Sequence, residues 1–386
     1  MILARRMEEI ESFHVMAILA RARALEAQGR SIVHMEIGEP DFPAVTAIVE
    51  AGIAALRAGH TQYTPALGLP ALRAAIAANY PEAARPDPAR VVVTPGSSGA
   101  LALVFGALIS PGDEVLMADP GYPCNRHFVR LFEGQAILVP GDASTSYQLT
   151  AARIRQHWTS ATRAVLISSP SNPTGSLVPD VEMIEIVRAV RELGGVLIVD
   201  EIYHGLTYNV QAKSVLHHST DVFVVNSFSK YYGMTGWRVG WLVAPQEYVE
   251  PIDRLAQNIF LAASTPAQHA ALAAFQPEVL AMLDQRRDEF RTRRDYLLPA
   301  LRALGFDIPV TPEGAFYLYA DSGRLAPDSG DFAHRLLEEA GVAITPGRDF
   351  GVYAPSRHVR FSYANTQAQL HEGVRRIADF LGQPPP

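Results

Sequence analysis

Lysine is rare in this chain, and this narrows where amine chemistry could occur. The 33 basic side chains include only two lysines, Lys213 and Lys230. An enzyme that forms a Schiff base needs an amine that can attack a carbonyl carbon, and arginine cannot replace it because the guanidinium stays protonated. Lys230 follows an apolar run, in the segment Ser-Phe-Ser-Lys-Tyr-Tyr-Gly-Met-Thr-Gly-Trp-Arg of residues 227–238, whereas Lys213 has no such surroundings. Lys230 is therefore the predicted reactive amine.

Further polar side chains stand directly after short apolar runs. Such runs are typical of strands in a mostly parallel sheet that is covered on both faces. Ligands of such sheets bind at the carboxyl ends of the strands, so we expect the groups at these ends to lie together. They are the Pro-Gly-Ser-Ser-Gly segment 95–99 after the run 91–94, Asn172 after 164–168, Asp200 and Tyr203 after 196–199, and Lys230 after 222–226.

This set of groups suits pyridoxal phosphate, a phosphorylated aromatic aldehyde. Lys230 would form the Schiff base with the aldehyde. Asp200 would face the pyridine nitrogen and keep it protonated, so that the ring can accept electrons. Asn172 and Tyr203 would donate hydrogen bonds to the 3′ oxygen, and Tyr122 would stack on the ring.

The phosphate of this cofactor needs backbone N–H groups at a helix start and a cation. The turn at residues 96–99 opens a helical pattern, and serines and an arginine flank the lysine. Each of these residues alone has an ordinary role as a turn residue, a cap or a surface charge, and only their joint position at successive strand ends predicts a cofactor site. The predicted phosphate-binding residues are Ser97, Ser98, Ser227, Ser229 and Arg238.

The elements that would hold these groups alternate between helical and strand patterns from residue 46 to residue 245. This predicts the α/β class, with a three-layer α/β/α large domain around a mostly parallel sheet (44–285) and a smaller α+β domain (1–43 and 286–386). One helix is predicted at 14–28, with Ser12 as its cap and Gly29 as its stop, and another at 277–304. The predicted strands are 91–94, 114–118, 136–139, 164–168, 196–199, 222–226 and 240–244.

The composition is that of an ordinary soluble, mildly acidic protein. Apolar residues make up 48% of the chain and charged residues 19%, with a formal charge of -7, so no nucleic-acid footprint is predicted. The single cysteine, Cys124, excludes an intramolecular disulfide and fits a reducing compartment. The N-terminus carries charges where a signal peptide would be apolar, and no apolar run approaches the ~20 residues of a membrane helix. We expect a cytoplasmic protein without membrane or nucleic-acid partners.

Several segments resemble the class I/II aminotransferases, the fold-type-I pyridoxal phosphate enzymes of the aspartate aminotransferase type. The resemblance begins with Asn-Pro-Thr-Gly at 172–175, Asp-Glu-Ile-Tyr at 200–203 and the lysine segment continued to Gly240. It extends over nearly the whole chain. The other segments similar to family motifs are Gly-Glu-Pro-Asp-Phe at 38–42, Tyr-Thr-Pro-Ala-Leu-Gly-Leu-Pro-Ala-Leu-Arg at 63–73, Pro-Gly-Asp-Glu at 111–114 and His-Val-Arg-Phe-Ser at 358–362.

The resemblance implies roles that the residues alone do not show. Arg360 would bind the substrate α-carboxylate through two parallel hydrogen bonds, with Asn172 and the backbone N–H of Gly38 beside it. Tyr63 would reach the phosphate bound in a neighbouring subunit, which implies a homodimer with shared active sites. No metal is expected.

The predicted activity is a ping-pong amino transfer between an L-amino acid and a 2-oxo acid, in which Lys230 moves the α-proton. The alternative on the same fold is a carbon–sulfur β-lyase, which would release pyruvate and ammonia from a cysteine conjugate without an amino acceptor; a cyclising enzyme such as a 1-aminocyclopropane-1-carboxylate synthase is a related variant. An aminotransferase-like domain of a transcription regulator would need a DNA-binding domain, and too few residues precede Gly38. A nicotinamide enzyme would need a G-x-G-x-x-G segment, which no glycine cluster supplies.

The sequence does not predict which amino acid is the donor. Arg126 and Arg130 follow Tyr122 and are either ligands for a second substrate carboxylate or ordinary helix-surface charges. The stretch at residues 13–16 either covers the substrate or packs as the start of the first helix.

Overall fold

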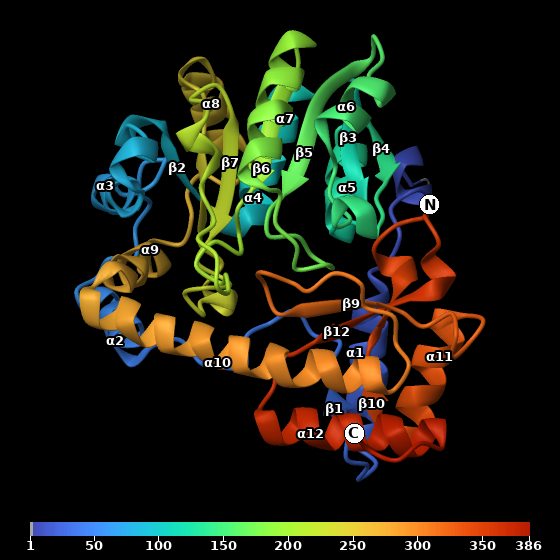
Figure 1. The fold of residues 1–386 in the computed structure, drawn as a ribbon. Coiled ribbons are helices and arrows are strands. Elements are labelled where there is room, and N and C mark those ends of the chain that lie inside the picture. The colour runs from blue at the N-terminus through green and yellow to red at the C-terminus, as the bar shows by residue number, and fades with distance from the viewer. Residues whose placement is uncertain (1–2) are drawn as a thin grey trace.

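The computed structural model describes residues 3–386, and its largest element is a seven-stranded sheet (Figure 1). The neighbouring strands from β7 to β4 are parallel, whereas β8 is antiparallel to both of its neighbours. The predicted α/β class with a mostly parallel sheet is confirmed. In spatial order the strands are β2 (Val91–Thr94), β8 (Gly240–Val243), β7 (Phe223–Ser227), β6 (Val196–Asp200), β5 (Thr162–Ser168), β3 (Glu114–Asp119) and β4 (Gln135–Pro140).

Helices cover both faces of this sheet because successive strand residues point to opposite sides. In β2, Val92 belongs to the apolar core formed with α4 (Gly96–Leu108), while Val91 and Val93 belong to the core formed with α7 (Asp180–Glu192). Both faces are apolar, which explains why the strands are continuously apolar in sequence. The other helices in these cores are α2 (Thr46–Arg57), α3 (Pro70–Asn79), α5 (Pro123–Leu131), α6 (Ala151–His157), α8 (Val249–Ile259) and α9 (Thr265–Leu272).

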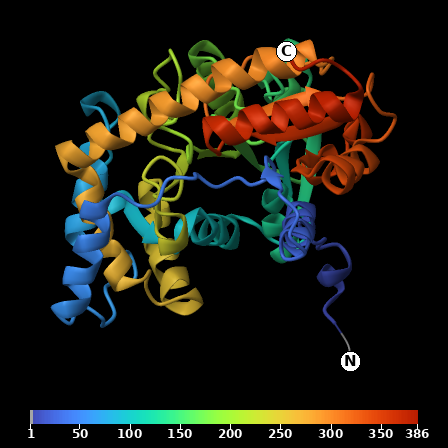
Figure 2. The ribbon, with the colours of Figure 1, turned by 90° about the horizontal axis from the view of Figure 1, so that it is seen from below.

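A further apolar core surrounds a three-stranded antiparallel sheet, drawn below the large sheet in Figure 1. The long helix α10 (Pro277–Ala303) contributes side chains to both regions, and Figure 2 shows it lying beside α12 (Gln367–Leu381). The predicted domain boundary at 285/286 falls inside α10, and the division into two domains stays a prediction. The remaining elements here are β9 (Tyr317–Asp321), α11 (Ser329–Arg335), β11 (Thr345–Pro346) and β12 (His358–Ser362).

The first elements of the chain lie against its last hundred residues. Strand β1 (Val33–His34) pairs in parallel with β10 (Val342–Ala343), and α1 (His14–Glu26) packs nearby. The prediction of Ser12 as the cap of α1 is wrong. The carboxylate of the buried Asp349 accepts from the first backbone N–H groups of α1, at 2.9 and 2.8 Å. A residue 335 positions away thus satisfies the free donors that every helix start presents.

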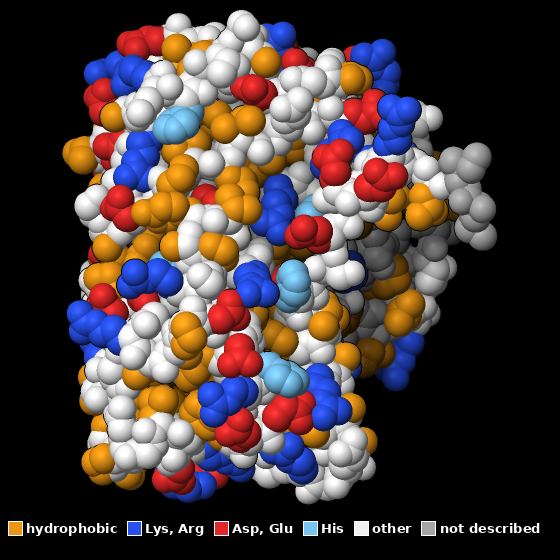
Figure 3. Space-filling model, turned by 90° about the vertical axis from the view of Figure 1, so that its right-hand side faces the viewer, with side chains coloured by type: hydrophobic (Ala, Val, Ile, Leu, Met, Phe, Trp, Pro, Cys, Tyr) orange, Lys and Arg blue, Asp and Glu red, His pale blue; other side chains and the backbone are white. Residues whose placement is uncertain are grey.

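Charges on the surface are mixed in sign. The face shown in Figure 3 carries basic, acidic and apolar side chains interspersed. Arg126 and Arg130 on α5 are paired with Glu11 and Glu9 at 3.4 and 2.7 Å, so both guanidinium groups already have a carboxylate partner. None of the helices within residues 3–386 combines the length and the apolar character that crossing a membrane requires.

Candidate active site

A cavity of about 510 Å³ opens at the carboxyl edge of the large sheet, and residues from β12 and α1 close its other side. Strands β5, β6 and β7 are parallel, so their ends meet at this edge. Eleven of the thirteen site residues predicted from the sequence line this cavity. They are Gly38, Ser97, Ser98, Tyr122, Asn172, Asp200, Tyr203, Ser229, Lys230, Arg238 and Arg360.

The other two predicted residues lie outside this lining. The hydroxyl of Ser227 is buried and lies within hydrogen-bond distance of Ser229 Oγ, at 2.9 Å, and of the Val239 carbonyl oxygen, at 3.2 Å. Ser227 therefore braces the loop that carries Lys230 from within. Tyr63 is 83% exposed, so its phenol points away from this chain's own cavity.

Lys230 reaches the cavity from the loop that follows β7. Its Nζ donates to the carbonyl oxygen of Gly38 at 2.6 Å. Burial lowers the pKa of this amine to about 8; the nearby guanidinium groups act in the same direction, and nearby carboxylates act against it. A neutral, nucleophilic fraction of the amine is therefore present near neutral pH.

Asp200 is the last residue of β6 and is only 6% exposed. Burial raises the pKa of its carboxyl group to about 7, although Oδ1 accepts the backbone N–H of Ile202 at 3.0 Å. A protonated ring nitrogen beside this group would favour its charged form. The carboxyl group thus fits the position that a pyridine cofactor requires.

The start of α4 and the Arg238 side chain form a site suited to phosphate. A Cβ atom added to Gly96, whose φ is +69°, would lie 2.5 Å from Nη2 of Arg238, so only glycine lets the guanidinium rest there. Nη1 of Arg238 donates to the Thr235 carbonyl oxygen at 3.1 Å. Free N–H groups of a first helical turn together with a guanidinium suit a phosphate. Ser97 and Ser98 lie in that turn.

Arg360 is a buried cation that has no anionic partner among residues 3–386. It is 2% exposed, and its hydrogen bonds within residues 3–386 go only to the neutral oxygens of Asn172, Glu36 and Thr345, the first at 2.9 Å. Its Nε has no hydrogen-bond partner among those residues. A buried charge without a counter-ion is costly, so this position suits a carboxylate that arrives with a ligand.

Sequence reasoning did not identify Tyr317. The Arg360 guanidinium lies 4.3 Å from the centre of its ring, and its hydroxyl is 2.9 Å from the Tyr203 hydroxyl. Tyr317 therefore supports both the predicted carboxylate ligand and a predicted cofactor ligand. In the sequence it is one aromatic residue in an apolar strand, which is the ordinary pattern of a core residue. Only the pairing of β9 with β12 brings it under Arg360.

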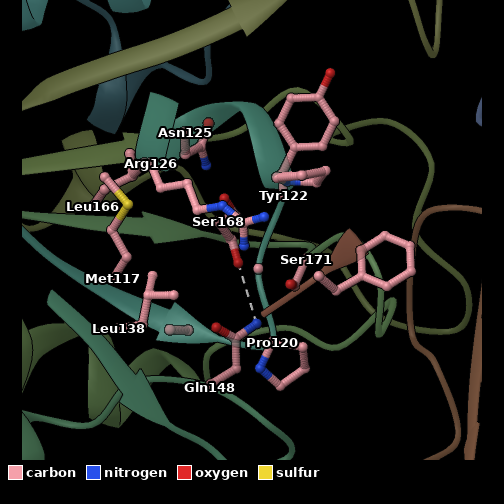
Figure 4. Close-up of a pocket in the computed structure, with 14 residues that line it drawn as sticks. Met117, Pro120, Tyr122, Asn125, Arg126, Leu138, Gln148, Leu166, Ser168 and Ser171 are labelled. Atoms are coloured by element: carbon pink, nitrogen blue, oxygen red, sulfur yellow. Dashed lines mark hydrogen bonds between the residues drawn. The ribbon is translucent and has the colours of Figure 1, made fainter. Parts of the chain in front are cut away.

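A second, much smaller cavity of about 30 Å³ lies behind Tyr122 (Figure 4). It has room for a water molecule or two, not for a substrate. Figure 4 shows Arg126 extending toward Ser168 in this space, where Gln148 donates to the Ser168 carbonyl oxygen at 3.1 Å. Arg126 does not line the larger cavity, and the same holds for Arg130.

Comparison with known proteins gives one consistent family. The family described as aminotransferase class I and II matches residues 30–377. A valine–pyruvate aminotransferase of Mycobacterium tuberculosis is 37% identical over 376 residues, covering 96% of this chain and 97% of the relative. An aspartate/prephenate aminotransferase of Thermus thermophilus is 34% identical over 386 residues, covering 99% of each. A crystal structure of an aminotransferase from Mycobacterium tuberculosis superposes with a TM-score of 0.96 at 37% identity, covering 99% of both chains.

These matches extend over nearly the whole chain and agree with the geometry of the cavity. An amine of lowered pKa, a buried carboxyl group and a cationic helix start fit the aldehyde, ring nitrogen and phosphate of one cofactor. The predictions of the family, of an enzyme and of pyridoxal phosphate as its cofactor are confirmed. The chain belongs to the class I and II aminotransferases and is a pyridoxal phosphate-dependent transferase.

Proposed function

We propose that this aminotransferase moves an amino group from an L-amino acid to a 2-oxo acid in two half-reactions, with Lys230 as the cofactor-bearing lysine. One observation carries the proposal: Arg360, which is buried and has no anion beside it in the described part of the chain, lines the same cavity as Lys230, whose pKa is lowered by burial. An α-amino acid has a carboxylate for the first group and an amino group and α-proton for the second.

The proposed ligands of the cofactor are those described above. Arg238, Ser229 and the first turn of α4 would hold the phosphate, Asn172 and Tyr203 would donate to the 3′ oxygen, and Tyr122 would cover the ring. When bound, pyridoxal phosphate supplies an electron-accepting ring that stabilises negative charge at the substrate α-carbon. Asp200 keeps the ring nitrogen protonated by giving it a buried carboxylate.

The chain's own residues account for the movement of the proton. The α-carboxylate, held by Arg360 and the Gly38 N–H, would orient the α-carbon toward Lys230. The Nζ of Lys230, once displaced by the substrate amine, takes up the α-proton because burial keeps part of this amine neutral. Gly38 lies next to Lys230, since its carbonyl oxygen accepts from Nζ of that residue, and the carbonyl oxygen of Glu36, two residues earlier, accepts from Arg360.

Arg360→Lys is expected to weaken amino acid binding by about 10- to 100-fold, because an ammonium cannot make the two parallel hydrogen bonds of a guanidinium. The rate of the half-reaction at saturating amino acid should change less than the dissociation constant. Stopped-flow measurement of cofactor absorbance against amino acid concentration separates the two parameters. An unchanged dissociation constant would show that the α-carboxylate binds elsewhere.

We further propose a homodimer in which Tyr63 of the partner subunit reaches the phosphate. Its support is the 83% exposure of Tyr63, an unusual position for a tyrosine that belongs to a site motif. Sedimentation equilibrium is expected to give twice the chain mass of 42.0 kDa. Tyr63→Phe is expected to raise the dissociation constant of pyridoxal phosphate about 5- to 10-fold, by the loss of one hydrogen bond to a charged group. A monomer with full affinity for the cofactor would contradict both statements.

The donor is tested by a half-reaction screen. Each amino acid is added to the cofactor-loaded protein, and the loss of visible cofactor absorbance is followed together with 2-oxo acid formation. The relatives named above act on valine with pyruvate and on aspartate or prephenate, so apolar and acidic amino acids both belong in the screen. Pyruvate and ammonia released from a cysteine conjugate without an acceptor, in the absence of amino transfer, would favour the β-lyase instead.

A further inference from the structure

One wall of the cavity is apolar and comes largely from the N-terminal part of the chain. Helix α1 presents Met16 and Leu19, which are three residues apart and therefore share a helical face. The ring of Phe13, just before α1, meets the ring of Tyr122 edge to face at 6.2 Å. Other aliphatic and aromatic residues that line the cavity include Val15, Ile37, Leu101 and Phe128.

This wall begins beside the reacting groups. Ile37 lies between Glu36, whose carbonyl oxygen accepts from Arg360, and Gly38, whose carbonyl oxygen accepts from Lys230. An amino acid whose carboxylate is on Arg360 and whose α-carbon is near Lys230 therefore has Ile37 at its side. The space open to its side chain is bounded by the apolar residues of α1.

Of the basic side chains around this space, all but one already have a proposed role in binding the cofactor or the α-carboxylate. Among residues 3–386, Lys230, Arg238, Arg360 and Arg23 are the basic side chains that line the cavity. Arg23 is exposed and lies seven residues beyond Met16 on α1, roughly 10 Å further along the helix. Arg23 lies one helical turn beyond Leu19, so among the cavity-lining cations of residues 3–386 it is the one left for a second substrate carboxylate, and Met16 and Leu19 precede it along α1.

One acidic side chain of the cavity acts against a second carboxylate. Glu39 and Asp200 both line the cavity; Asp200 is assigned to the ring nitrogen of the cofactor, so Glu39 is the carboxylate that would repel an anionic side chain. Burying a carboxylate against aliphatic groups without a partner is unfavourable, whereas burying a hydrocarbon there is favourable.

We propose that the preferred donors are L-amino acids with large apolar side chains, such as leucine, methionine and phenylalanine, and that Leu19 is a specificity-determining residue. This rests on the proposed function. Discrimination by one or more methylene groups in an apolar pocket amounts to roughly 10- to 200-fold. We therefore expect leucine to exceed alanine in kcat/KM by that factor, and aspartate to react no faster than alanine.

The test compares leucine, phenylalanine, alanine, aspartate and glutamate in the half-reaction of the cofactor-loaded protein. Leu19→Ala should lower kcat/KM for leucine about tenfold and leave alanine within twofold, because only the longer side chain reaches that position. Leu19→Arg should lower leucine further and raise the ratio of aspartate to leucine at least tenfold. Ala20→Arg is the matched control: Ala20 is an exposed neighbour on α1 outside the cavity lining, and its substitution should change each value less than twofold.

The outcomes separate this inference from the proposed function. If aspartate or glutamate reacts faster than leucine in the wild-type protein, the apolar specificity is overturned while amino transfer stands. If both Leu19 variants keep the wild-type ranking of substrates, Leu19 does not determine specificity. If no amino acid discharges the cofactor, the proposed function itself fails.

Discussion

Lys230→Ala is expected to abolish amino transfer, with kcat/KM lowered on the order of 10⁴-fold or more. The variant would lose the proposed attachment point of the cofactor and the group proposed to move the α-proton, and general acid–base catalysis alone contributes roughly 10²- to 10⁴-fold. Borohydride reduction followed by mass spectrometry of the peptide around position 230 should find the cofactor attached in the wild-type protein and absent from the variant. Lys230→Arg should be equally inactive, because it restores the charge but not a nucleophilic amine.

Lys213→Ala is the matched control for this experiment, since Lys213 is the only other lysine in the chain. Its Nζ lies 2.8 Å from Asp180 Oδ2 in an exposed ion pair. Exposed pairs of this kind contribute about 1 kcal/mol or less to stability, so activity should stay within twofold of the wild type. Normal turnover in Lys230→Ala, or cofactor found on Lys213, would remove the assignment of Lys230.

Asp200→Asn is expected to lower kcat at least about 100-fold and yet to stabilise the cofactor-free protein. The loss of activity follows because an amide cannot hold the ring nitrogen protonated, and a single positioned electrostatic group typically contributes 10²- to 10³-fold. The gain in stability follows from the pKa of Asp200, which burial raises from 3.8 to about 7. Above that pH the wild-type protein holds a buried negative charge, which costs a few kcal/mol that the asparagine variant avoids.

The stability of the cofactor-free protein should depend on pH because of Asp200, and the direction of this dependence follows from the raised pKa. Between about pH 4 and 7 the folded cofactor-free protein keeps a proton on Asp200 that the unfolded chain has released, so wild-type stability falls as the pH rises through this window. Asp200→Asn lacks this decline, and its advantage should be largest at pH 8 and absent near pH 3.5. Thermal unfolding with and without pyridoxal phosphate measures both effects, and the cofactor should stabilise the variant less. Asp253→Asn, at a partly exposed position of α8, is the control and should shift neither curve. A variant less stable than the wild type at pH 8 without cofactor would contradict the assigned burial cost.

The predicted catalytic groups were identified from short patterns of apolar and polar residues in the sequence. Strand ends can be recognised from short apolar runs, and parallel strands bring their carboxyl ends to one edge whatever the rest of the chain does. Asp200, Asn172 and Lys230 follow such runs directly, so their convergence was predictable. Ser227 satisfied the same rule, but its hydroxyl turns inward to Ser229. The direction of one side chain within a loop depends on the contacts of that loop, which a run of residue types does not specify.

The sequence by itself predicted the reactive amine, the cofactor and the sheet that presents it, because each of these predictions depends on residues close together in the chain. The tertiary structure alone decided what surrounds the substrate. Asp349 caps α1 from 335 residues away, Tyr317 lies under Arg360 through strand pairing, and Leu19 enters the cavity because α1 packs against the C-terminal strands. The physical reason is that these contacts join segments that are far apart in the sequence. Such segments come together only when the whole chain packs. Their residues carry no local pattern that distinguishes them from ordinary core or surface positions.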